Sequence, residues 1–126
     1  MDEQAFKHRT RAVALRVIRL VDSLPKTRVA DVIGRQLLRS ATSIGANYRA
    51  ACRGVSRADV ISKLGDVEEE GDETLYWLEL LIDSGVIPER RLRSLTNEVD
   101  EIIAMTVSSI RTMRKKNPKS KIQNPK

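Results

Sequence analysis

Apolar residues recur at every third or fourth position through most of the chain, which is the spacing of one face of an α-helix. No segment alternates apolar and polar residues as a half-buried strand does. The regularity is clearest in residues 57–84, where a 4-3-4-4-3-4 spacing joins Val60, Leu64, Val67, Gly71, Leu75, Leu78 and Ile82. This spacing is typical of helices that pack in a bundle.

The same periodicity predicts four helices, at roughly residues 5–24, 28–53, 57–84 and 88–115. Short turns separate them, so consecutive helices are expected to run antiparallel. We therefore predict an all-α fold, an antiparallel up-down-up-down four-helix bundle formed by residues 1–116. Residues 117–126 are rich in lysine, include two prolines and show no periodicity, so we predict a disordered basic tail there.

Residues that start and stop helices stand near these boundaries. Pro25 ends the first helix, because proline disfavours the helical conformation of the residue before it. Gly54 is placed to end the second helix as a C′ residue with a positive φ. Ser56, with Asp59 three residues later, predicts an N-cap and a capping box. Gly45 lies inside the second helix at a cost of about 1 kcal/mol, so we expect it to allow close approach by a neighbouring helix.

One face of the second predicted helix carries a line of arginines. At about 100° of turn per residue, five of them fall within an arc of roughly 80°: Arg28, Arg35, Arg39, Arg49 and Arg53, the arginine stripe. Arginine is permanently charged and forks onto phosphate oxygens, so the stripe predicts contact with a nucleic-acid backbone. In the first helix, Arg9 and Arg16 are expected to share the face opposite its apolar stripe.

The charge distribution supports two interpretations of the arginine stripe. Residues 1–58 carry a formal charge of +8, residues 59–84 carry −8 and residues 85–126 carry +6, for a net charge of +6. The basic segments could bind a polyanion. Alternatively, the acidic third helix could neutralise the arginines, within one subunit or across an interface between subunits. The sequence leaves both interpretations open.

The acidic third helix also raises the question of a metal site. Its carboxylates cluster at Glu68, Glu69, Glu70, Asp72 and Glu73. Carboxylate bundles that hold two metal ions use Glu-x-x-His pairs on facing helices, and the only histidine here is His8. We therefore predict no metal and no cofactor. Glu68 and Asp72 are instead expected to meet an arginine or Asn47 of another helix, and the other three carboxylates to face water or a neighbouring subunit.

No residues suggest catalysis. Cys52 lies near the buried edge of the second helix and is predicted to be a small core residue rather than a nucleophile. Ser40, Ser43 and Asn47 are assigned to tight helix contacts. The sequence therefore predicts a protein that is not an enzyme.

A second apolar face is predicted on the third helix. Tyr76, Trp77 and Leu80 point away from the core positions of that helix. Aromatic residues are enriched at the centres of interfaces, so we expect this face to be buried against another chain in an oligomer. The alternative is burial under the N-terminal residues or a loop of the same chain.

Composition places the protein in the cytoplasm by default. A single cysteine cannot form an internal disulfide, so nothing indicates an oxidising compartment. The N-terminal residues include Lys7, Arg9 and Arg11 and lack the apolar core of a signal peptide. No apolar run approaches the twenty or so residues that span a bilayer, so no membrane association is expected.

The second helix also carries a motif that resembles a known family. Bacterial four-helix-bundle proteins first described as encoded in large-subunit ribosomal RNA intervening sequences have an R-x-A-x-S-I-x-x-N run, matched here by Arg39, Ala41, Ser43, Ile44 and Asn47. A following helix start is matched by Ser56, Asp59 and Val60. The chain departs from the commoner N-I-A-E-G continuation, because Asn47 is followed by Tyr48-Arg49-Ala50-Ala51 and an arginine is added.

The resemblance implies more than the spacing does. The family is similar in fold to the accessory proteins of diversity-generating retroelements, which form homopentamers and bind nucleic acid and a reverse transcriptase. We therefore expect a non-catalytic oligomeric module that binds RNA or DNA backbone and assists a nucleic-acid enzyme. The alternative hypothesis is a protein-interaction scaffold whose arginines pair with acidic third helices of neighbouring subunits.

Overall fold

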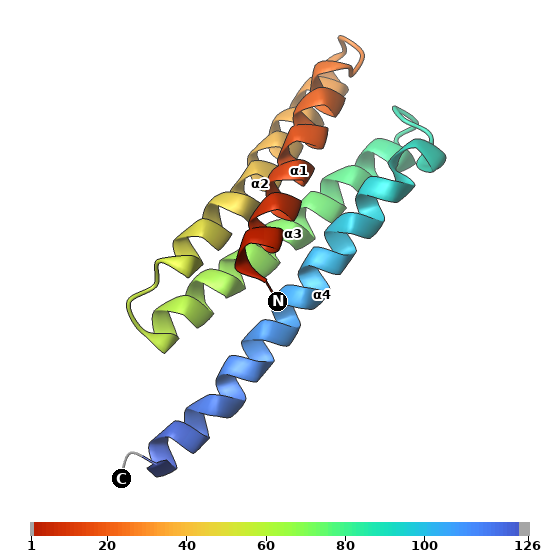
Figure 1. The fold of residues 1–126 in the computed structure, drawn as a ribbon. Coiled ribbons are helices and arrows are strands. Elements are labelled where there is room, and N and C mark those ends of the chain that lie inside the picture. The colour runs from red at the N-terminus through yellow and green to blue at the C-terminus, as the bar shows by residue number, and fades with distance from the viewer. Residues whose placement is uncertain (1, 124–126) are drawn as a thin grey trace.

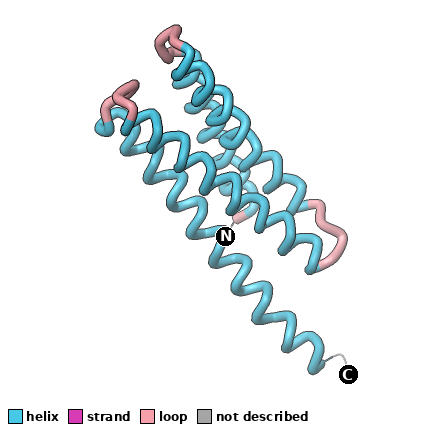
Figure 2. Tube along the Cα trace, turned by 180° about the vertical axis from the view of Figure 1, so that it is seen from behind, coloured by secondary structure: helices cyan, strands magenta, loops and turns pink. Residues whose placement is uncertain are grey.

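The structure, a computed structural model, describes the backbone of residues 2–123 and the side chains of residues 2–115. Its four helices are α1 (Glu3–Asp22), α2 (Arg28–Cys52), α3 (Arg57–Asp83) and α4 (Glu89–Gln123). The turns α1–α2 and α3–α4 lie at one end of the molecule and the turn α2–α3 at the other (Figure 2). This arrangement confirms the predicted up-down-up-down bundle, and no strand occurs among the described residues.

The helix starts are capped by side chains. The carboxylate of Asp2 and the hydroxyl of Thr27 accept backbone N–H groups at the starts of α1 and α2. At the start of α3, the Ser56 hydroxyl accepts the Asp59 N–H at 3.0 Å, while the Asp59 carboxylate accepts the Val55 N–H at 3.2 Å. These bonds confirm the predicted N-cap and satisfy donors that a helix start leaves without a partner.

Gly54 has a different role from the predicted one. The C-cap of α2 is Arg53, with φ −104°, and the glycine that follows does not have a positive φ. A Cβ on Gly54 would instead lie 2.5 Å from Cγ2 of Val60 and 3.1 Å from Oδ2 of Asp59. The position requires glycine because the side chains of Asp59 and Val60, in the first turn of α3, press against it. Among the described residues, the positive φ belongs to Gly85, at +80°, in the turn after α3.

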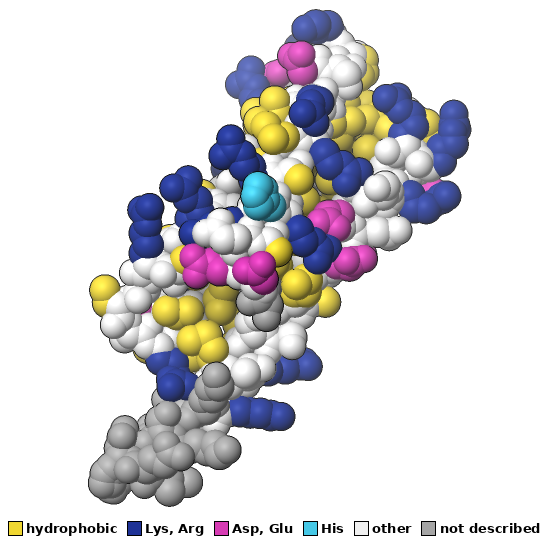
Figure 3. Space-filling view, in the orientation of Figure 1, with side chains coloured by type: hydrophobic (Ala, Val, Ile, Leu, Met, Phe, Trp, Pro, Cys, Tyr) yellow, Lys and Arg dark blue, Asp and Glu magenta, His cyan; other side chains and the backbone are white. Residues whose placement is uncertain are grey.

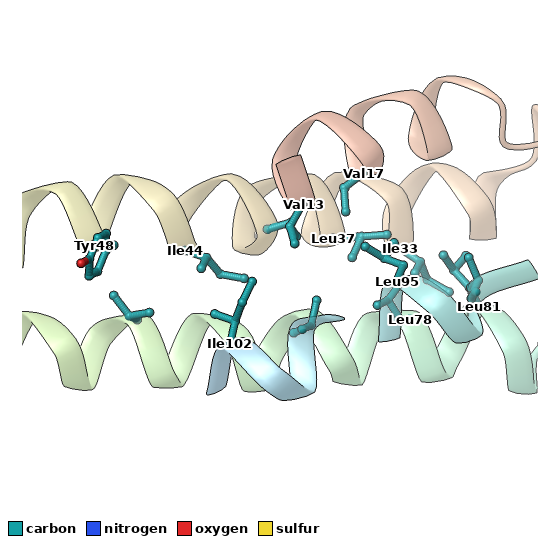
Figure 4. Packing of buried hydrophobic residues seen from close by; sticks show 14 of the residues in the cluster. Val13, Val17, Ile33, Leu37, Ile44, Tyr48, Leu78, Leu81, Leu95 and Ile102 are labelled. Carbon is teal, nitrogen blue, oxygen red and sulfur yellow. The ribbon is translucent and has the colours of Figure 1, made fainter. Parts of the chain in front are cut away.

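The core is formed by the facing apolar edges of the helices (Figure 4). Its fully buried members come from all four helices and include Val13, Val17, Leu37, Ile44, Leu78, Leu81, Val99 and Ile102. Burying one large aliphatic side chain contributes about 1.5–3 kcal/mol. At one end, the rings of Phe6 and Tyr48 meet edge to face with centroids 4.6 Å apart. Buried hydroxyls also join α2 to α3, because those of Ser40 and Thr74 share a hydrogen bond of 3.0 Å.

The seam between α1 and α4 is held by polar contacts. Nε and Nη2 of Arg9 donate to the two carboxylate oxygens of Glu98 at 2.9 and 2.8 Å, and Nη2 also reaches Glu101 at 2.8 Å. Arg16 donates to Ser94 at 3.1 Å. The expectation that Arg9 and Arg16 share the face opposite the apolar stripe is therefore wrong. Both arginines flank the apolar stripe of α1, on the side of the helix that faces α4.

The fourth helix is longer than expected. It runs to Gln123, beyond the predicted end near Lys115, and extends past the α2–α3 turn (Figure 1). The lysines of this segment are good helix formers, whereas Pro118 is unfavourable inside a helix, so composition accounts for the extension only in part. The predicted tail of residues 117–126 thus begins within the described helix, and its last three residues lie outside the described part of the chain.

Candidate nucleic-acid interface

The arginine stripe lies along the outer face of α2. Ile33, Leu37 and Ile44 face the core, so the opposite side of the helix is turned to solvent. All five members of the stripe are exposed: Arg28, Arg35, Arg39, Arg49 and Arg53. The side chain of Arg35 is 78% exposed. The structure thus places the guanidinium groups on one accessible surface, but whether they are free depends on their partners.

Arg39 pairs with the acidic third helix. Its Nη1 lies 3.3 Å from the Glu70 carboxylate, and its Nη2 donates to Glu73. The expectation that these two carboxylates face water or a neighbouring subunit holds in part, because Glu73 is exposed, but it missed their arginine partner. Both are bound by an arginine of the same chain, since the antiparallel register of α2 and α3 brings these residues to one level. The pairing interpretation of the stripe holds for Arg39.

The other members of the stripe are largely uncompensated. Arg35 lies 3.0 Å from Asp31 one turn earlier in α2, and both side chains are mostly exposed. Such surface pairs contribute little and are easily exchanged for another anion. Arg28, Arg49 and Arg53 form no ion pair with any residue that the structure describes. Most of the arginine stripe is therefore available to bind an external anion.

The family motif, in contrast, serves the packing of α2. Ala41 and Ile44 are fully buried. The Ser43 hydroxyl donates to the Arg39 carbonyl at 2.7 Å, and the Asn47 amide donates to the Ser43 carbonyl at 3.0 Å. Asn47 thus bonds within its own helix and not to Glu68 or Asp72 as one alternative expected. The motif residues hold α2 in the bundle, and the uncompensated arginines lie outside the motif.

The first helix supplies cations that sequence reasoning missed. A hollow of about 530 Å³ lies between α1 and α2, lined by Lys7, Thr10, Arg11, Ala14, Thr42, Gly45, Ala46 and Arg49. We call it the α1–α2 groove. A Cβ on Gly45 would lie 3.2 Å from Oγ1 of Thr10, which supports the prediction that this glycine allows close helix approach. Arg11 is exposed and, like Arg49, forms no ion pair with a described residue, whereas Lys7 pairs with Glu3 at 3.0 Å.

Basic side chains continue beyond this groove. A second hollow of about 780 Å³, at the α1–α2 turn, is bordered by Lys26, Arg28 and Arg35, with Asp22 and Asp31 beside them. In Figure 3, basic side chains follow the edge on the side of the α1–α2 hairpin, and others follow the opposite edge, on the side of α4. The positive surface therefore extends over the outer side of the α1–α2 hairpin rather than along α2 alone. The signal in the sequence was the i, i+4 spacing of Lys7 and Arg11 on the solvent side of the first helix.

The predicted oligomer face is partly accessible. Tyr76 is 54% exposed, and its ring meets that of Trp77 edge to face at 5.1 Å. Trp77 and Leu80 are half-buried against the core of their own chain. The indole Nε1 of Trp77 is shielded from solvent without a hydrogen-bond partner among the described residues. Burial within the chain therefore accounts for part of this face, and the exposed part remains a predicted interface.

Metal ligands and Cys52 are the remaining candidates for chemistry. No three His, Cys, Asp or Glu side chains in that part of the chain converge on a point that could hold a metal ion. Cys52 is half-buried beside Tyr48 at the wall of an apolar hollow. Burial raises the pKa of the Tyr48 phenol well above its ordinary value, with a further contribution from Cys52, so the phenol stays neutral. None of the described helices has the length and apolar character needed to cross a membrane.

Comparison with known proteins identifies the family. Residues 3–108 match the family described as 23S rRNA-intervening sequence protein. The chain belongs to this family. This member of the family is a four-helix bundle in which Ala41 and Ile44 of the motif pack into the core. A solved structure from Bacteroides thetaiotaomicron, a protein of unknown function from the S23 ribosomal protein family, superposes with a TM-score of 0.82 and is 39% identical, covering 88% of this chain and 99% of the other.

The description of the family names no enzyme, and the solved structure belongs to a protein of unknown function. A search among curated proteins found no match to this chain. The family and the four-helix fold are therefore established, and the function has to be argued from the surface.

Proposed function

We propose that this protein is a non-catalytic, self-associating helical module that binds the sugar–phosphate backbone of a nucleic acid. The observation that carries the proposal is the set of exposed guanidinium groups on α2 without a strong internal partner: Arg28, Arg35, Arg49 and Arg53. Clustered arginines of one sign raise the local concentration of polyanions and fork onto phosphate oxygens. Each phosphate that they neutralise adds affinity without choosing a base sequence.

Arg39 is outside the proposed binding set. Its guanidinium already satisfies two carboxylates of α3, and a phosphate would have to displace them. Its place in the family motif is explained by this link between α2 and α3. The proposed contact surface therefore depends on the arginines at the two ends of α2.

The proposal includes a role as an accessory or scaffold to a nucleic-acid enzyme such as a reverse transcriptase. Support comes from the resemblance to accessory proteins of diversity-generating retroelements and from a family name that refers to ribosomal RNA. The same resemblance supports assembly into a homopentamer. An oligomer would repeat the basic surface and multiply its affinity for a long polyanion.

Binding to duplexes at several salt concentrations tests the proposal. We expect a labelled duplex to bind at about 50 mM salt and to dissociate as the salt rises to about 200 mM. The double variant Arg49→Gln with Arg53→Gln should weaken binding on the order of tenfold or more. The matched control, Arg90→Gln with Arg91→Gln, removes two exposed charges from the start of α4 and should bind like the parent. No affinity at the lowest salt, or equal losses in both variants, would overturn the proposal.

A protein-interaction scaffold is the second candidate. It is favoured by the exposed Tyr76 and by carboxylates of α3, such as Glu69 and Asp72, that are exposed and make no ion pair with a described residue. Those carboxylates could pair with Arg49 of a neighbouring subunit. Charge reversal by Arg49→Glu should then lower the mass measured by light scattering. An unchanged mass would contradict this alternative.

A further inference from the structure

We infer that the α1–α2 groove holds the phosphate backbone of a double-stranded nucleic acid, gripped by Arg11 of α1 on one side and by Arg49 of α2 on the other. This inference rests on the proposed function and goes beyond it in two respects. It adds α1 to the binding surface, and it specifies a duplex. Neither follows from the stripe on α2.

The groove combines the shape and the charge that a phosphate chain requires. Apart from the three cations, its lining residues are small, among them Ala14, Thr42 and Ala46, so a backbone can approach the helices closely. Arg11 and Arg49 stand on opposite walls. No carboxylate is among the lining residues, although Lys7, which is one of them, pairs with Glu3 at 3.0 Å. Arg11 and Arg49, which make no ion pair with a described residue, therefore border a hollow of about 530 Å³ and carry the proposed anion site.

The close contact of the two helices fixes the width of the groove. Gly45 of α2 packs against Thr10 of α1, where an added Cβ would lie only 3.2 Å from the threonine hydroxyl oxygen. The phenyl ring of Phe6 packs against Tyr48 at the same end of the hairpin. Arg11 and Arg49 therefore extend from rigid helices rather than from loops, and little order has to be gained on binding.

The chemistry of the groove favours a duplex over a single strand. Proteins that bind single strands stack the bases on aromatic side chains, at about 1–3 kcal/mol per base. The chain has only four aromatic residues. Phe6 and Tyr48 are buried, and the other two lie on α3, so no ring borders the groove. A duplex turns its phosphates outward and stacks its own bases, which suits a surface that offers only charge and small side chains.

The contact with the duplex can extend along α2 toward the α1–α2 turn. Arg35 and Arg49 are 14 positions apart in one helix, which is about 21 Å at 1.5 Å per residue. Between them the outer face of α2 carries uncharged residues such as Thr42 and Ala46, apart from Arg39 with its carboxylate partners. Long arginine side chains at that separation can reach the two backbones that border a major groove of about 12 Å.

Two pairs of variants test the groove itself. Arg11→Gln removes a charge from its wall, and its control Arg90→Gln removes an equal charge from the start of α4. Ala46→Leu adds bulk to the lining of the groove without changing charge, and its control Ala12→Leu places the same side chain at another exposed helix position. The probes are a labelled duplex of about 20 base pairs, roughly two helical turns, and one of its strands alone.

We expect Arg11→Gln and Ala46→Leu each to weaken duplex binding on the order of fivefold to tenfold, and both controls to bind like the parent. The parent should bind the duplex more tightly than the single strand at equal salt. If the parent binds the duplex but neither groove variant differs from its control, the groove is not the site, while the proposed function stands. Equal or tighter binding of the single strand would overturn the choice of a duplex. If the parent binds neither probe, the proposed function fails as well.

Discussion

Replacement of Arg9 by glutamine tests the account of how the bundle is closed. The guanidinium of Arg9 is the main polar link between α1 and α4, with three N–H···O contacts of 2.8–2.9 Å to Glu98 and Glu101. Its Nη1 also lies 3.1 Å from Sδ of Met105. Glutamine keeps a polar side chain of moderate length but lacks the charge and the bidentate hydrogen bonding of the guanidinium group. The variant should therefore fold into the same bundle with a weaker seam.

The expected loss of stability is about 1–1.5 kcal/mol. The side chains of Arg9 and Glu98 remain 31% and 25% exposed, so the pair belongs near the surface range of about 0.2–1 kcal/mol rather than with buried pairs. Its two-pronged geometry places it at the upper end of that range. Without the arginine, Glu98 and Glu101 are like charges one turn apart, which adds a few tenths of a kcal/mol. For a domain of this size the midpoint of thermal unfolding should fall by about 3–8 °C.

The loss should depend on pH. The hydrogen bond from Arg9 lowers the pKa of the Glu98 carboxyl below its ordinary value, and the same bond raises the pKa of the arginine. A carboxyl whose pKa is lowered by folding contributes stability above its unfolded pKa, about 4.3 for glutamate, and loses it as the pH falls through the folded pKa. The difference in the free energy of unfolding between the parent and Arg9→Gln should therefore be largest at neutral pH and decrease below about pH 4.

Urea unfolding followed by circular dichroism, at one protein concentration, measures this gap. Arg11→Gln is the matched control, because Arg11 lies two residues further along α1, carries the same charge and has no ion pair with a described residue. It should unfold at nearly the same urea concentration as the parent. Equal stabilities of the two variants at neutral pH, or a gap that persists undiminished in acid, would refute the role assigned to Arg9.

Three further predictions concern other features. Gly54→Ala should destabilise the protein by about 1–3 kcal/mol because the new methyl group meets Val60, and a gain in unfolding midpoint would contradict the close approach described for this glycine. Arg39→Gln should lower stability while changing duplex affinity less than Arg49→Gln does, and the reverse order would return Arg39 to the binding surface. Leu80→Glu should reduce the mass measured by light scattering, and an unchanged mass would exclude this part of α3 from the subunit interface.

The periodicity of apolar residues was sufficient to predict the architecture. The turn residues limit the helices to four, and the apolar spacing correctly marks Leu64, Val67 and Leu78 as buried on α3. The predicted stripe is wrong in its second half, because Thr74 and Leu81 are buried there while Leu75 and Ile82 are half-buried. Local hydrogen-bond signals were equally dependable, as Ser56 and Asp59 show, because a cap depends on residues three positions apart. Gly54 was misjudged because glycine suits both a positive φ and a crowded site, and only the position of Val60 decides between them.

Contacts between helices were harder to predict. The pairing of Arg39 with Glu70 and Glu73 depends on the register of α2 against α3, which the separate helix patterns do not contain. Arg9 and its partner Glu98 each flank an apolar stripe, so their meeting required knowing that α1 and α4 are neighbours. The α1–α2 groove likewise depends on how α1 packs against α2, so the pattern of arginines along α2 alone does not predict it.

The salt dependence of duplex binding tests the central claim most directly. If Arg49 and Arg53 each neutralise one phosphate, the slope of log affinity against log salt should be shallower by about 1.8 for Arg49→Gln with Arg53→Gln than for the parent, counted per engaged subunit. The control with Arg90→Gln and Arg91→Gln should keep the slope of the parent. A parent protein that binds no duplex at about 50 mM salt, or a slope that the Arg49 and Arg53 substitutions leave unchanged, would contradict the account.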